Sequence, residues 1–218
     1  MKLPPRIVPG RDQVRFNGDV PVEIPDDRPR VEIELTDGSV AVLSPLTPED
    51  RELLEEGLDQ LSIMSRFTRF GHGVSQLSKG ELDYLTEIDQ RTHVAWGAIV
   101  DGEVAGVARY IGVDSMGCSE VAVTAVDAFQ RKGLGSALFA ALVATARADA
   151  VAEFCFEVVP GNAAVEHVIE GIEVHLDDSG SLIEGRIRIS DLPRHIQEPE
   201  LVEVMEAVRS QADEPPSA

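Results

Sequence analysis

Basic residues are scarce in this sequence. Its 218 residues include 19 Lys and Arg against 39 Asp and Glu, which gives a formal net charge of -20. A surface of this sign repels phosphate, so the composition argues against nucleic-acid binding. It favours a positively charged partner, although the same charge could serve only to keep the protein in solution.

Cysteines and long apolar runs are also few. Only Cys118 and Cys155 are present, outside any C-x-x-C motif and inside two predicted strands, so we expect buried free thiols in a reducing cytoplasm. No apolar run reaches the length that spans a bilayer, and the first residues do not read as a signal peptide. We therefore predict a cytoplasmic protein without membrane attachment. No metal-ligand cluster is visible, and we expect no metal ion.

The composition is sufficient for one folded domain. Hydrophobic residues make up 43% of the chain, and 218 residues are typical of a single α/β domain with terminal extensions. Residues 1–30 contain six prolines and predict an extended arm. Residues 31–195 form the predicted domain. Residues 196–218 predict an acidic helix over 199–208 and a disordered tail from Gln211.

The periodicity of apolar residues predicts alternating strands and helices. Thr47 and Pro48 mark a helix start, and Ser78 with Glu81 has the spacing of a capping box. Asp37-Gly38 and Asp101-Gly102 are typical hairpin turns. The expected elements are a hairpin over 31–43, a helix from 47 with Leu53, Leu54, Leu58 and Leu61 on its buried face, a turn-rich segment over 62–70, a helix over 78–88, strands over 94–100, 104–110, 120–126 and 151–159, a helix over 136–148, a short helix over 163–171 and a hairpin over 174–190.

The most informative stretch joins the Val-rich strand over 120–126 to the Ala/Leu-rich helix over 136–148. Between them lies Gln130-Arg131-Lys132-Gly133-Leu134-Gly135-Ser136. Two glycines at a strand-to-helix junction allow positive φ and close backbone approach. The first N–H groups of the helix then form an anion-binding site, to which Arg131 and Lys132 add charge. The spacing matches neither the P-loop nor the dinucleotide fingerprint.

The spacing Gln-x-x-Gly-x-Gly, with the strand before it and the helix after it, resembles the acetyl-CoA pyrophosphate loop of the GNAT N-acetyltransferases. The resemblance extends over residues 40–174 and implies the GNAT acyl-CoA N-acyltransferase fold, an α/β (α+β) fold with a mixed, mostly antiparallel sheet flanked by helices. It implies acetyl-CoA as co-substrate, with its pyrophosphate on residues 130–136 and its pantetheine paired along Val123 and Ala125.

Within that family the sequence is most similar to the acetyltransferase domain of bacterial Pat-type protein lysine acetyltransferases. The matching segments are residues 46–50 (LTPED), 65–70 (SRFTRF), 82–89 (LDYLTEID) and 104–110 (VAGVARY). These enzymes have a glutamate at the place of Glu120, where it acts as general base. A carboxylate opening an apolar strand is costly to bury unless it is used, so we expect a desolvated Glu120 with a raised pKa. The alternative is a strand-end glutamate that faces solvent or pairs with an arginine.

The region after the next strand matches the family only in part. Asn162 matches an asparagine that contacts the cofactor, but Ile169 stands where many members have a tyrosine, and Glu173-Val174 replaces a Gly-Phe pair. Pat-type domains also lack that tyrosine. His167 could donate a proton instead, and His72, between two glycines, could line the substrate entrance; each could equally be a solvated histidine.

The sequence leaves the acceptor open. The resemblance favours direct acetyl transfer to a protein lysine, with Glu120 removing a proton from the amine and a strand N–H polarising the thioester carbonyl. A small amine such as a polyamine, an aminoglycoside or an amino acid is the first alternative, and a non-catalytic acyl-CoA sensor is the second. Either a monomer or a homodimer is compatible with the sequence.

Overall fold

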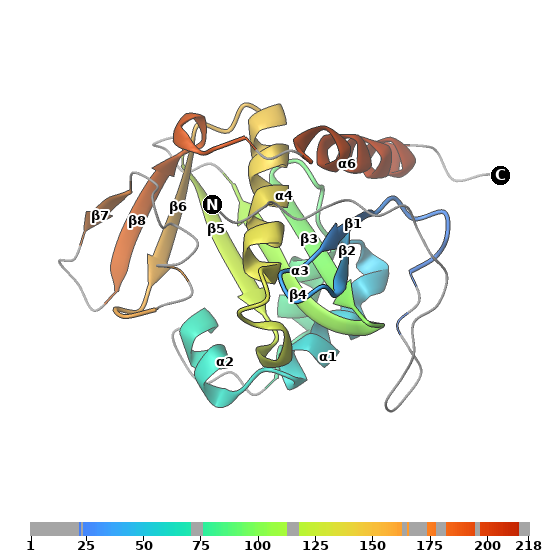
Figure 1. Cartoon of the computed structure of the whole chain (residues 1–218), viewed down its shortest axis with the longest axis horizontal. Coiled ribbons are helices and arrows are strands. Elements are labelled where there is room, and N and C mark those ends of the chain that lie inside the picture. The colour runs from blue at the N-terminus through green and yellow to red at the C-terminus, as the bar shows by residue number, and fades with distance from the viewer. Residues whose placement is uncertain are drawn as a thin grey trace.

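A mixed sheet forms the centre of the molecule. The computed structural model describes residues 22, 24–70, 76–112, 118–162, 165, 174–177, 182–194 and 197–213. Within these ranges the strands form one sheet in the order β1-β2-β3-β4-β5-β6-β8-β7 (Figure 1). Only the β5–β6 pair is parallel in the described part of the sheet, as expected for a mostly antiparallel fold. The strands are β1 (Val31–Glu34), β2 (Val40–Pro45), β3 (His93–Val100), β4 (Glu103–Ile111), β5 (Cys118–Ala125), β6 (Glu153–Val158), β7 (His175–Asp177) and β8 (Ile183–Arg188).

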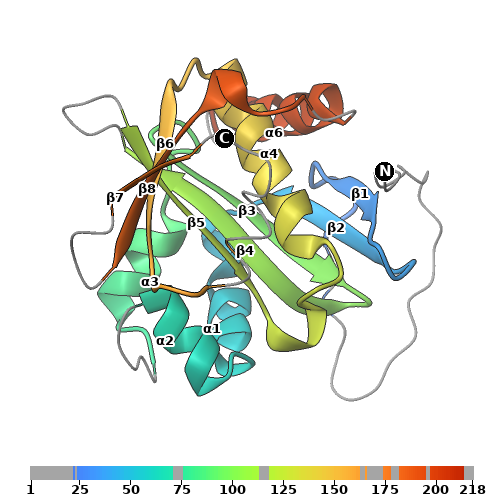
Figure 2. The ribbon, with the colours of Figure 1, turned by 60° about the vertical axis from the view of Figure 1, so that its left-hand side comes forward.

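Helices cover both faces of the sheet. One face carries α4 and α6, and the opposite face carries α1, α2 and α3 (Figure 2). The α-helices are α1 (Arg51–Asp59), α2 (Ile63–Phe70), α3 (Lys79–Thr86), α4 (Leu134–Ala148) and α6 (Glu198–Asp213). Short 3-10 turns are η1 (Pro48–Asp50), η2 (Asp127–Phe129) and η3 (Ile189–Asp191). The sheet thus separates the side of the molecule that carries α4 and α6 from the side that carries α1, α2 and α3.

The local signals in the sequence act as predicted. Asp101 and Gly102 both have positive φ (53° and 78°), as the tight β3–β4 hairpin requires. At the start of α3, the Ser78 side chain accepts from Glu81 N–H and the Glu81 carboxylate accepts from Ser78 N–H. These contacts satisfy backbone donors that the helix leaves free.

The main core lies between α4 and the sheet. Trp96 and Phe154 are fully buried there, together with most of the apolar face of α4. The indole of Trp96 donates to Thr145 Oγ1 of α4 (3.2 Å), which satisfies its polar N–H inside the core. Burial on this face fixes the position of α4 and of the loop that precedes it.

Two sequence predictions need correction. The segment over 62–70 is the helix α2 rather than a turn-rich stretch, and α6 continues through Asp213, past the predicted start of the tail at Gln211. Most of the short helix predicted over 163–171 lies outside the described residues. Within the described residues, no helix has the length and apolar character needed to cross a membrane.

Candidate active site

The strands β5 and β6 form a fork. They pair in parallel over three positions, from Cys118 opposite Glu153 to Glu120 opposite Cys155, and no pairing continues beyond Glu120. Figure 1 shows the two strands diverging toward their C-terminal ends. On its other side β5 remains paired with β4 through Ala125. Within the described residues, the β6-facing edge of residues 121–125 is therefore free of strand pairing, and an extended ligand can pair with such an edge.

Glu120 lies at the point where the fork opens. It is the last residue of β5 that pairs with β6, and its side chain is exposed. The expectation of a desolvated carboxylate is therefore wrong. The two preceding residues of β5, Cys118 and Ser119, are buried, whereas Glu120 is exposed at the last position that pairs with β6. The nearby Arg69 of α2 interacts electrostatically with the Glu120 carboxylate.

The loop after β5 has the backbone geometry of an anion site. Arg131 and Gly133 adopt positive φ (61° and 89°), and Gly133 is the N-cap of α4. The first helical hydrogen bond runs from Ala137 N–H to Gly133 O (3.0 Å), so the N–H groups of residues 134–136 have no acceptor within the helix. A Cβ on Gly135 would meet no heavy atom within 4 Å. The N-terminus of α4 therefore has room for an anion beside its free donors.

The side chains of this loop have different roles. Arg131 and Ser136 are exposed, whereas Leu134 is buried in the core and contributes only its backbone. Lys132 Nζ lies 3.3 Å from Asp37 Oδ2, so part of its charge is already neutralised by that carboxylate. Among the described residues, none forms an ion pair with Arg131, so its charge is available to a ligand.

Gln130 braces the loop through a network that the sequence did not reveal. Its Nε2 donates to Ala125 O (3.1 Å) and to Asp127 Oδ1 (2.8 Å). Asp127 also accepts from Ser62 N–H (2.8 Å) and from the Ser65 hydroxyl. Burial alone would raise the pKa of Asp127, but these hydrogen bonds outweigh it and lower the pKa. Asp127 thereby ties the start of α2 to the end of β5.

The other predicted site residues lie on both arms of the fork. Val123 and Ala125 are half-buried on β5, and Asn162 follows β6 and accepts from Val165 N–H through Oδ1 (3.4 Å). His72 and His167 lie outside the described residues. The described residues contain no group of three or more His, Cys, Asp or Glu side chains arranged to hold a metal ion.

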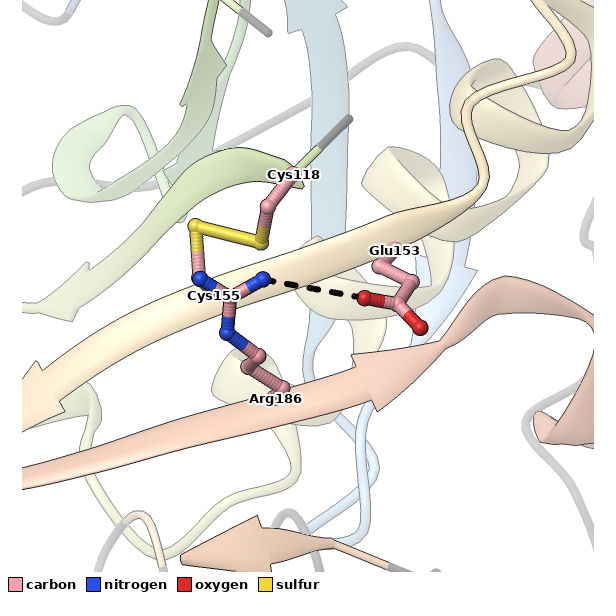
Figure 3. The surroundings of a disulfide bond; sticks show 4 residues. All are labelled: Cys118, Glu153, Cys155 and Arg186. Carbon is pink, nitrogen blue, oxygen red and sulfur yellow. Dashed lines mark ion pairs between the residues drawn. A yellow bond between two sulfur atoms is a disulfide. The ribbon is translucent and has the colours of Figure 1, made fainter. Parts of the chain in front are cut away.

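A disulfide closes the fork at its narrow end. Cys118 and Cys155 are joined, with their Cα atoms 5.8 Å apart, within the range that disulfides require (Figure 3). The prediction of free thiols is therefore wrong. The bridge joins the first residue of β5 that pairs with β6 to the last residue of β6 that pairs with β5. Arg186 of β8 is close to it, with its Nη1 3.9 Å from Glu153 Oε2 (Figure 3).

These residues fit acetyl-CoA in the way that the resemblance implies. The open Gly135 and the free N–H groups at the start of α4 suit a pyrophosphate, and the unpaired edge of β5 suits the amides of a pantetheine arm. Glu120, at the opening of the fork, is a carboxylate beside the end of such an arm.

Comparison with known proteins agrees with this geometry. The sequence model of the acetyltransferase (GNAT) family matches residues 61–170. An acetyltransferase of Pseudomonas aeruginosa is 36% identical over 117 residues, which are 52% of this chain and 63% of that protein. The acetyltransferase Pat of Mycolicibacterium smegmatis is 29% identical over 145 residues, 64% of this chain and 43% of Pat. The chain thus spans less than two thirds of either relative.

A solved structure shows the same architecture. The crystal structure of the GNAT domain of S. lividans PAT superposes with a TM-score of 0.69 at 27% identity, over 76% of this chain and 99% of that domain. The family match covers half of the chain and includes β5, the loop and α4. The chain belongs to the GNAT acetyltransferase family.

Proposed function

We propose that this chain transfers the acetyl group of acetyl-CoA to an amine, with Glu120 as the general base. The observation that carries the proposal is the fork between β5 and β6, which opens at Glu120 while β5 leads directly to the anion site at the start of α4. One strand thus connects a position for the base with a position for the pyrophosphate.

Each part of the site has a role in this reaction. Arg131 and the N–H groups of residues 134–136 bind the pyrophosphate, and the free edge of residues 121–125 pairs with the pantetheine amides. Glu120 accepts a proton from the acceptor ammonium, through water, because its exposed carboxylate is in contact with solvent. The neutral amine then attacks the thioester carbon, so that the C–N bond forms and the C–S bond breaks. The second amine proton goes to the leaving thiolate.

We further propose a protein lysine as acceptor. Two of the similar proteins are named Pat, and the net charge of -20 attracts cationic surfaces. A small amine is the second candidate, and a cavity between the sheet and helices α1 to α3 suits one that also carries a carboxylate, such as an amino acid. With a volume of about 440 Å³, this cavity has room for a small molecule.

The role of Glu120 is tested by Glu120→Gln, which keeps the shape of the side chain and removes the base. We expect acetyl transfer to fall by about 10²–10⁴-fold while acetyl-CoA affinity stays close to wild type. Glu103→Gln is the matched control, because Glu103 is also an exposed strand glutamate but lies at the start of β4, outside the fork. Wild-type turnover by Glu120→Gln at neutral pH would contradict the assignment.

The acceptor is tested with labelled acetyl-CoA, incubated with either cell lysate or a panel of small amines. Label on defined lysines supports the protein acceptor, and label on small amines alone supports the second candidate. If acetyl-CoA binds but no acceptor is labelled, the chain is an acyl-CoA sensor and the proposed activity is wrong.

A further inference from the structure

A cavity lies between the sheet and helices α1 to α3, on the face opposite α4. It encloses about 440 Å³, a size typical of small-molecule sites. Val107, in the middle of the central strand β4, is only half-buried although α1 covers this face (Figure 2). Leu53 and Leu54 of α1, predicted as core residues, are also half-buried and line the same cavity. The apolar face of α1 is thus not fully packed against the sheet.

Arg109 carries a buried positive charge into this cavity. The residue is 3% exposed and lines the cavity wall. Its Nη1 donates to Leu85 O (3.2 Å) and to His93 Nε2 (3.1 Å). Within the described part of the chain, no group accepts from its Nε or Nη2 and no carboxylate pairs with it. Burial, reinforced by repulsion from Arg69, lowers its pKa to about 10, so it remains a cation at neutral pH.

Arg69 brings a second positive charge to the same wall. It comes from α2 and lines the cavity, and burial lowers its pKa while the Glu120 carboxylate opposes that effect. In the described residues it has no carboxylate within ion-pair distance. Two like charges that repel each other in a partly desolvated site are unfavourable unless an anion joins them.

The described polar groups that line the cavity do not provide an anion that joins both arginines, and Glu120 acts on Arg69 from beyond ion-pair distance. Arg28 and Asp50 line it too, but they pair with each other. Glu49 and Glu52 are exposed. Thr124 Oγ1, on the cavity wall, is buried and has no hydrogen-bond partner within the described residues. A buried hydroxyl without a partner is costly, and a ligand oxygen would satisfy it.

We propose that this cavity binds a small organic carboxylate with an apolar body, whose carboxylate is held by Arg69 and Arg109. Guanidinium groups form strong charge-assisted hydrogen bonds with carboxylates, and the leucines of α1 with Val107 supply an apolar surface for the rest of the ligand. The ligand carries a single carboxylate because most of the wall is apolar. Binding here goes beyond the proposed acetyl transfer and is measured without acetyl-CoA, so the failure of one leaves the other standing.

The test compares two probes of the same shape, 3-phenylpropanoate and the neutral 3-phenylpropanamide, by calorimetry on the full chain. We expect the carboxylate to bind at least about 10-fold more tightly than the amide, because only the carboxylate forms charge-assisted bonds. Arg109→Met and Arg69→Met should each remove about 10-fold of that affinity. The control Arg91→Met removes an exposed charge, paired with the exposed Asp213, and should leave the affinity unchanged.

A second variant distinguishes loss of the binding site from misfolding of the protein. Val107→Phe places a ring in the cavity, so it should abolish carboxylate binding while the melting temperature stays equal to or above that of wild type. Equal binding of the amide, wild-type affinity in both arginine variants, or no binding of 3-phenylpropanoate at millimolar concentration would overturn the proposal. Incubation of L-phenylalanine with acetyl-CoA then separates two supporting outcomes: N-acetylation identifies the ligand as an acceptor, and binding without acetylation identifies a separate ligand site.

Discussion

The two glycines of the loop over residues 130–136 serve different purposes. Gly133 needs its positive φ of 89°, and a Cβ there would lie 3.1 Å from Thr36 Cγ2, so any side chain strains the fold. Gly135 has no such constraint, because a Cβ would point into open space beside the free N–H groups of α4. A substitution at Gly135 therefore separates ligand binding from folding.

We predict that Gly135→Asp weakens acetyl-CoA binding by about 100-fold or more, because the carboxylate occupies and repels the position of the pyrophosphate. The melting temperature should stay close to wild type, since an acidic residue suits the first turn of a helix. Gly80→Asp is the matched control: Gly80 is likewise the second residue of a helix, α3, with nothing near its Cβ. Calorimetry that shows equal affinity in both variants would refute the pyrophosphate site.

His93 gives the protein a pH-dependent stability. Burial, with repulsion from Arg109, lowers its pKa from 6.5 to about 4, against the attraction of Asp89. Between pH 4 and 6.5 the His93 imidazole is protonated in the unfolded chain but neutral in the folded protein. The contribution of neutral His93 to the free energy of unfolding is therefore complete above about pH 6.5 and is lost as the pH falls toward 4. The loss amounts to about 3 kcal/mol at most.

The measurement is denaturant unfolding of wild type and His93→Gln from pH 4 to 7. Glutamine keeps an oxygen that can accept from Arg109 but does not titrate. We expect a smaller loss of unfolding free energy toward pH 4 in the variant. Identical slopes in the two proteins would show that His93 is not the titrating group.

Sequence reasoning succeeded at residues whose role is local. The spacing of Gln130, Gly133 and Gly135 predicted a strand, a turn and a helix start, because the backbone there dictates the residue types. It failed at Glu120, whose exposure depends on where β6 leaves β5, and at Asp127, whose partners Ser62 and Ser65 are more than 60 residues away in the chain. Such contacts are set by strand order and packing, which periodicity does not encode.

At the scale of elements, the hairpins and the capped helices were predicted correctly and α2 was missed. Asp101-Gly102 and the Ser78–Glu81 box are local signals. The apolar residues Ile63, Phe67 and Phe70 of α2 recur at helical spacing, so the sequence does carry a helical pattern there. In the structure, however, Ile63, Met64 and Phe67 are exposed, so this apolar face packs little against the sheet. Its position depends instead on the hydrogen bonds from its first turn to Asp127.

The disulfide belongs to the scale of elements, because it joins β5 to β6 across the short segment in which the two strands pair. Cross-linking residues 37 positions apart restricts the unfolded chain and contributes about 3–4 kcal/mol in the chain-entropy account. We predict that Cys118→Ala with Cys155→Ala lowers the free energy of unfolding by about this amount. Denaturant unfolding of both proteins measures it.

Thiol titration of the denatured wild type, without reductant, provides the direct check. The bridge predicts no reactive thiol before reduction and two after it. Two reactive thiols in the unreduced protein, together with unfolding that does not respond to reductant, would show that the cysteines are free.

At the scale of the whole molecule, part of the positive charge is used in ion pairs that join elements of the fold. Several arginines are used internally: Arg209 binds Asp149 through two N–H groups (2.9 and 2.7 Å) and so fastens α6 to α4, and Arg147 binds Glu198 (2.7 Å). The Tyr110 hydroxyl donates to the same Asp149 (2.8 Å), and burial together with this contact raises the pKa of Tyr110. Cations engaged in this way do little to offset the acidic surface.

The remaining acidic surface makes acceptor binding sensitive to salt. A net charge of -20 attracts a basic peptide over a distance set by the Debye length, which shrinks from about 10 Å at 0.1 M to about 3 Å at 1 M salt. We predict that kcat/KM for a lysine-bearing basic peptide falls by about 10-fold or more over this range, at saturating acetyl-CoA. A peptide with the same acceptor lysine and a net negative charge is the control, and its rate should rise or stay constant because salt screens repulsion instead. If both peptides respond to salt alike, long-range attraction does not select the acceptor, and recognition then depends on short-range contacts at the fork.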